Sequence, residues 1–132
     1  RERRNSRMPS HGRLLVLDRI LSILLAVFSA GHGFVGVLST HPFLESSTVW
    51  GFAGSIAAWA IAVLNWLRAG RPGDIVIAAW ALAGVLVWIL LMLWLAAAAD
   101  MWQDMRIWFF VAACGGLAMF GIRDIMRANR QN

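Results

Sequence analysis

Residues 75–99 read IVIAAWALAGVLVWILLMLWLAAAA, and this stretch decides the fold of the chain. It contains no charged residue and no side-chain amide, hydroxyl or imidazole. It is longer than the ~20 apolar residues with which an α-helix crosses the ~30 Å hydrocarbon core of a bilayer. In lipid a helix satisfies its backbone hydrogen bonds internally, whereas in water this segment would expose apolar side chains on every side. The stretch therefore predicts a transmembrane helix.

The composition of the whole chain is also typical of a membrane protein. Of its 132 residues, 60% are hydrophobic and 14% are charged, whereas globular domains are roughly 45–50% apolar and about 25% charged. A chain of this length has no room for a separate soluble domain of ~100 residues beside its apolar runs. The polar loops are too short to build a catalytic site, so we expect no enzyme.

Three further apolar runs accompany residues 75–99. Together they predict four spans, at about residues 14–38, 48–67, 75–99 and 105–122. The first run is too long for the apolar core of a cleavable signal peptide, which has about 7–15 residues. Short, polar, basic tails are predicted at residues 1–13 and 123–132, so residues 1–132 form a single four-helix transmembrane domain.

The arginines predict how these spans are oriented. The net charge is +5, and every basic residue except Arg106 lies in or beside the N-terminal segment, the 68–74 turn or the C-terminal tail. Because basic loops are retained on the cytoplasmic side, both termini are predicted to be cytoplasmic. Short loops make neighbouring helices antiparallel. The predicted class is an all-α integral membrane protein, an up-down-up-down bundle in a bacterial inner membrane, with no nucleic-acid partner.

His32 is the polar residue that stands out inside a predicted span, where the sequence reads GHGF. A polar ring at that depth is costly unless it has a partner, so His32 is a candidate functional residue. The neighbouring Gly31, Gly33 and Gly36 leave space that could admit haem or chlorophyll, with the imidazole as the metal ligand. The same space could instead let another helix pack closely, with His32 hydrogen-bonded across the interface.

Other polar residues suggest a second, weaker site on the predicted outer side. Imidazole and carboxylate groups can together bind a divalent cation, and the candidates are His41, Glu45, Asp100 and Asp104. Their spacing matches no known ligand motif. Asp104 is equally expected to cap the fourth span.

Small residues recur at helical spacing and predict close helix packing, within the chain or with another protein. The predicted packing positions are Gly31, Gly33, Gly36, Gly54, Ala58, Ala62, Ala112 and Gly116. The chain is also rich in tryptophan, with eight residues. Most are expected in the interfacial belts, while Trp59, Trp80 and Trp88 lie deeper and could line a site for a cofactor, pigment or lipid.

These patterns favour an interaction role. The leading hypothesis is a small integral subunit that packs within a larger inner-membrane complex or a homo-oligomer, with lipid, other membrane proteins or itself as partners. One alternative is a redox or pigment module that binds a tetrapyrrole through His32. A second is an oligomeric channel or small transporter, although no acidic or basic residue is expected deep in any span, where proton-coupled transporters carry them.

Overall fold

The structure is a computed structural model that describes residues 10–39, 42–43 and 45–130. Its elements are α1 (Ser10–Gly31), the π-helical segment η1 (His32–Val37), α2 (Ser46–Ala69), α3 (Ile75–Ala98) and α4 (Met105–Ala128). No strand occurs in the described part of the chain. Four segments are long and apolar enough to cross a membrane: Gly12–Val37, Ser46–Ala69, Ile75–Ala98 and Met105–Ala128. The predicted all-helical class with four candidate spans is therefore confirmed, and it indicates a multi-pass membrane protein.

Helices α1, α2 and α4 continue beyond the apolar runs that predicted them. α1 begins at Ser10 rather than near residue 14, α2 reaches Ala69, and α4 continues to Ala128, past the predicted end at residue 122. Hydropathy detects the part of a helix that faces lipid, whereas the backbone continues in helical form wherever polar side chains find partners. Residues assigned to turns or tails by hydropathy, including Arg68 and Asp124, therefore lie inside helices.

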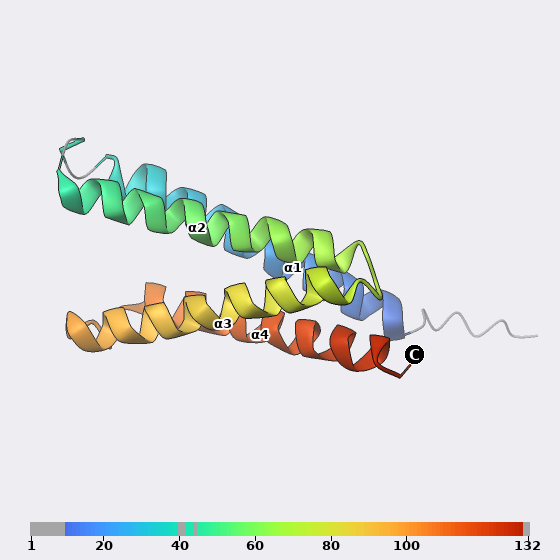
Figure 1. The fold of residues 1–132 in the computed structure, drawn as a ribbon. Helices are drawn as coiled ribbons and strands as arrows, with labels where there is room; N and C mark the ends of the chain where they lie inside the picture. The colour runs from blue at the N-terminus through green and yellow to red at the C-terminus, as the bar shows by residue number, and fades with distance from the viewer. Residues whose placement is uncertain (1–9, 40–41, 44, 131–132) are drawn as a thin grey trace, which may run out of the picture.

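The helices lie side by side as two pairs, α1 with α2 and α3 with α4 (Figure 1). α2 also packs on α3, and α1 on α4, which closes the bundle. The start of α1, the α2–α3 turn and the end of α4 lie together at one end, which we call the terminal end (Figure 1). The other two connections lie at the opposite, loop end, towards which the two pairs diverge in this view.

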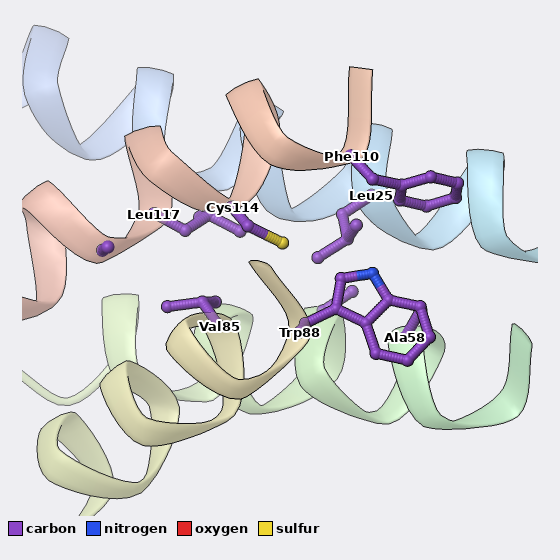
Figure 2. Packing of buried hydrophobic residues seen from close by; sticks show 9 residues of the cluster. Leu25, Ala58, Val85, Trp88, Phe110, Cys114 and Leu117 are labelled. Carbon is purple, nitrogen blue, oxygen red and sulfur yellow. The ribbon is translucent and has the colours of Figure 1, made fainter. Parts of the chain in front are cut away.

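The core between the pairs is built largely from small and medium-sized side chains (Figure 2). Leu25, Val85, Cys114 and Leu117 are completely buried, and Trp88 and Phe110 close the cluster towards the loop end. The predicted small-residue stripe of α2 contributes to this core, since Ala58 and Ala62 are each 1% exposed. These two residues therefore pack within the chain, where they let α2 approach its neighbours closely.

Two predicted packing glycines lie where helices touch. A Cβ atom on Gly33 would lie 2.8 Å from Cβ of Ser55 in α2, and one on Gly116 would lie 2.7 Å from Cδ1 of Leu21 in α1. The remaining predicted positions differ in their surroundings: Gly54 faces Trp88, Gly36 faces the ring of His32, Gly31 has open space and Ala112 is exposed.

The last turn and a half of the first span is π-helical, with i to i+5 hydrogen bonding. The Leu38 N–H donates to the Gly33 carbonyl at 3.0 Å. Such segments are rare, carry one extra residue in the turn, and often lie at functional sites. His32 is the first residue of this segment.

Tight turns join the later helices. Gly73 has a φ of +93° in the α2–α3 turn, and Asp74 caps α3 by accepting from the Ile77 N–H at 3.1 Å. After α3, Asp100 has a φ of +52°, and the Met101 N–H returns to the Ala96 carbonyl at 2.9 Å. This is the pattern of a Schellman helix end, in which one left-handed residue reverses the chain.

We expect Gly33→Ala to destabilise the bundle by about 1–3 kcal/mol, because overpacking a close contact forces side chains or backbone apart. The new Cβ would overlap the Ser55 Cβ, which cannot rotate away. Gly31→Ala is the matched control, since a Cβ there meets nothing within 4 Å. Unfolding of both variants in detergent measures the difference, and equal stabilities would show that η1 and α2 are not in close contact at Gly33.

Candidate functional site

Three charged side chains from three helices meet inside the terminal end of the bundle. Arg68 of α2 donates from Nη2 to Oδ1 of Asp18 in α1 and from Nη1 to Oδ2 of Asp124 in α4, both at 2.5 Å. Arg68 and Asp18 are each only 1% exposed. Arg68 Nε also donates to Asn65 Oδ1 at 3.3 Å. We call these four residues the charge network, and it links α1, α2 and α4.

The network is close to electrical balance. A buried guanidinium is tolerated only when its charge and its N–H groups find partners, and two carboxylates and an amide supply them here. Asp124 is shared, because Arg123 Nη2 donates to its Oδ1 at 3.2 Å. Asn65 is oriented by its own Nδ2, which donates to the Ile61 carbonyl at 3.0 Å. One group remains unused: Oδ2 of Asp18 is buried without a hydrogen-bond partner among the described residues.

A cavity of about 770 Å³ opens beside the charge network, and we call it the terminal-end cavity. Its walls come from α1, the end of α2, the α2–α3 turn and the end of α4 with the residues that follow it. The charged residues that line it are Asp18, Arg19, Arg68, Arg123, Asp124, Arg127 and Arg130. Five guanidinium groups against two carboxylates leave an excess of three positive charges.

Sequence reasoning missed this site because each member has an ordinary explanation by itself. Asp18 is near a span end, Arg68 begins a polar turn and Asp124 follows an apolar run. Their pairing joins residues that are 50 and 56 positions apart. A signal was nevertheless present: Asp18 and Asp124 are acids close to span ends on the arginine-rich side, where the positive-inside rule accounts only for positive charge.

A second cavity, of about 310 Å³, lies between the two helix pairs towards the loop end, and we call it the His32 pocket. Half-buried His32 lines it together with Trp50, Trp88 and Phe110. The rings of His32 and Trp88 each lie edge-on to Phe110, with ring centroids 6.4 Å apart. Trp88 is 8% exposed, and its Nε1 has no hydrogen-bond partner in the part of the chain that the structure describes.

Asp104, a predicted metal candidate, lies at the rim of the His32 pocket and caps α4. It accepts from the Arg106 backbone N–H at 2.9 Å. The Arg106 guanidinium also binds it, from Nε at 2.9 Å and from Nη2 at 2.5 Å. These hydrogen bonds from Arg106 lower the pKa of Asp104 to about 2, so the carboxylate is charged and already engaged at neutral pH.

Of the other predicted metal candidates, Glu45 and Asp100 form no metal-binding group with Asp104 among the described residues. His41 lies outside the described residues. Glu45 precedes α2, is exposed and accepts from the Ser47 hydroxyl at 3.2 Å. Asp100 occupies the left-handed position of the α3–α4 turn. Within residues 10–39, 42–43 and 45–130, no three His, Cys, Asp or Glu side chains are grouped so as to hold a metal ion.

The third candidate site is an apolar groove of about 350 Å³ between the first span and α2. We call it the α1–α2 groove, and it is lined by Ser29, Ala30, Gly33, Phe34, Phe52, Ser55, Ile56 and Trp59. The two serine hydroxyls do not make it polar, because Ser29 donates to the Leu25 carbonyl and Ser55 to the Gly51 carbonyl. Trp59, which the sequence placed deep in a span, lines this groove, and 51% of its surface is exposed.

No protein-family model, no curated protein and no solved structure matches this chain. Its function must therefore be inferred from the chemistry of these three sites. One site is charged, one is aromatic with an imidazole, and one is apolar and open to the surroundings of the bundle.

We expect Arg68→Met to destabilise the protein by about 3–5 kcal/mol, because it leaves the buried Asp18 carboxylate without a counter-charge. Arg71→Met is the control, since Arg71 is exposed in the adjoining turn. Adding Asp18→Asn to the Arg68→Met variant should restore part of the loss. Denaturant titration in mixed micelles gives these free energies of unfolding, and equal effects of the Arg68 and Arg71 changes would contradict the buried network.

Proposed function

We propose that this chain is a small integral membrane subunit with a structural or interaction role, and that it assembles with further copies of itself through the α1–α2 groove. The support comes from the shape of this face. Small residues such as Ala30 and Gly33 form the hollow, while Phe34, Ile56 and Trp59 stand beside it, 51–62% exposed. A surface with both hollows and projecting side chains suits a two-fold interface, in which each copy fills the hollow of the other.

The distribution of burial supports the same proposal. In the most apolar 18-residue stretch of α4, 44% of the residues are buried inside the protein. In the corresponding stretch of each of the other three spans, 22% are buried. The outer faces of α1, α2 and α3 are therefore left for lipid or for other helices. Association of helices in lipid depends on close van der Waals packing, which a groove lined by small residues permits.

The orientation in the membrane belongs to the proposal. The terminal end carries the arginines of the cavity, whereas the loop end carries Arg106, which is paired with Asp104. By the positive-inside rule the terminal end would face the cytoplasm, so the up-down-up-down bundle would have both termini there. A bacterial inner membrane is the proposed location.

Ala30→Phe should fill the groove and shift the oligomer to smaller species, because the hollow would no longer accept a side chain of a second copy. Ala79→Phe, on an exposed face of α3 outside the groove, is the matched control. Light scattering of the purified protein in mild detergent measures the oligomeric state.

A wild-type protein that is monomeric at every concentration would overturn self-assembly. Equal behaviour of the Ala30 and Ala79 variants would exclude the groove as the interface. If instead a different membrane protein co-purifies with the wild type and is lost from the Ala30 variant alone, the groove serves a larger complex.

The His32 pocket favours a second candidate function, the binding of a tetrapyrrole. Its supporting observation is an imidazole on the wall of an aromatic pocket between helix pairs. Haem added to the purified protein should then show a Soret band shifted from that of free haem in the same detergent, and His32→Ala should abolish the shift. His11→Ala, which changes the histidine in the first turn of α1, should keep the shift. A wild type that leaves the spectrum of free haem unchanged, or a shift unaffected by the His32 change, would eliminate this function.

A further inference from the structure

We propose that the terminal-end cavity binds a phosphate ester that carries free hydroxyl groups, such as a glycerophosphate. The cavity is distinct from the α1–α2 groove and from the His32 pocket, and no residue lines both it and either of them. Its defining property is an excess of three positive charges around a volume of about 770 Å³.

The carboxylates of the cavity are already engaged by the deeper arginines. Arg68 binds both Asp18 and Asp124, and Arg123 binds the second oxygen of Asp124. A phosphate that entered the cavity would therefore meet carboxylates whose charge is largely compensated. These contacts within the protein reduce the repulsion that two free carboxylates would exert on an anion.

Guanidinium groups remain for a ligand. In the described part of the chain, neither Arg19 nor Arg130 is paired with a carboxylate. The Arg19 guanidinium lies 5.1 Å from the centre of the Trp66 ring, a cation–π contact that leaves its N–H edge available. Arg123 Nη1 has no acceptor among the described residues. The planar fork of donors on an arginine matches the oxygens of a phosphate in two parallel hydrogen bonds.

A hydroxyl group on the ligand would satisfy the remaining unpaired group of this wall once the Asp18 side chain turned its buried Oδ2 towards the cavity. Asp18 lines the cavity, is 1% exposed, and has one oxygen, Oδ2, without a partner. A buried acceptor of this kind needs a donor. A bare phosphate has only its own proton to offer, whereas a glycerol or sugar phosphate brings hydroxyl donors as well.

The depth and size of the cavity fit a lipid headgroup. α2 and α4 have 24 residues each, or about 36 Å at ~1.5 Å per residue, and so extend beyond a hydrocarbon layer of ~30 Å. Their ends at the cavity would lie in the layer of lipid phosphates. Basic pockets between transmembrane helices bind anionic headgroups for this reason, although a soluble phosphate ester offers the same groups.

The test measures thermal unfolding of the full chain in neutral detergent micelles, with phosphatidylglycerol, phosphatidylcholine or glycerol 3-phosphate added. The double variant Arg19→Gln/Arg130→Gln removes two guanidinium groups from the cavity. Arg13→Gln/Arg71→Gln removes two exposed ones that do not line it. Phosphatidylglycerol should raise the unfolding midpoint of the wild type and of the control saturably. In the Arg19/Arg130 variant, half-saturation should need roughly thirtyfold more lipid, since two arginines near the anionic group are lost.

The outcomes separate the sources of the ligand. A rise with phosphatidylglycerol alone identifies a lipid headgroup, and an equal, arginine-dependent rise with millimolar glycerol 3-phosphate identifies a soluble ester. The proposal is overturned if neither probe raises the midpoint of the wild type, if phosphatidylcholine acts equally, or if both double variants lose the response alike. The oligomeric state of the Arg19/Arg130 variant should equal that of the wild type, so failure here is distinguishable from failure of self-assembly.

Discussion

The burial of the Arg68 guanidinium is the constraint on which the terminal end of the bundle depends. A permanent positive charge is held there at 1% exposure, and two carboxylates from different helices approach it to 2.5 Å. Removing charges from water costs about as much as their attraction returns, so such a network adds little net stability by itself. Its effect is positional: α1, α2 and α4 must keep the one register in which Asp18, Arg68 and Asp124 meet. We infer that the network specifies the arrangement of the bundle, while dispersion between small residues holds the helices together.

The two ends of the bundle are consequently built on different chemistry. At the terminal end, ion pairs join helices across a basic cavity. At the loop end, towards which the helix pairs diverge in Figure 1, His32 starts the π-helical turn and lines a pocket together with aromatic rings. Between the ends lies a core in which Ala58 and Ala62 allow α2 close to its neighbours. A ligand that bound at either end would therefore act on the spacing of the same helix pairs.

The parts of this architecture that the sequence predicts are those imposed by the solvent. A lipid environment demands uninterrupted apolar runs, so four spans and a helical class follow from hydropathy alone. The continuation of α4 to Ala128 does not follow, because Arg123 and Asp124 end the apolar run while their side chains pair inside the fold. The pairing within the charge network likewise does not follow from the sequence, since contacts between residues 18, 68 and 124 depend on which helix faces meet. The small residues of α2 were identifiable as packing positions, but only the three-dimensional arrangement shows that Ala58 and Ala62 face the chain's own core.

The start of α1 and the end of α4 lie at the same end of the bundle (Figure 1). A chain that returns to the side where it began can be joined in tandem to a second copy through a short connecting peptide, without any additional crossing. Gene duplication followed by fusion would thus yield an eight-helix protein whose halves share one orientation. In such a protein one half could diverge while the other retained the original surfaces.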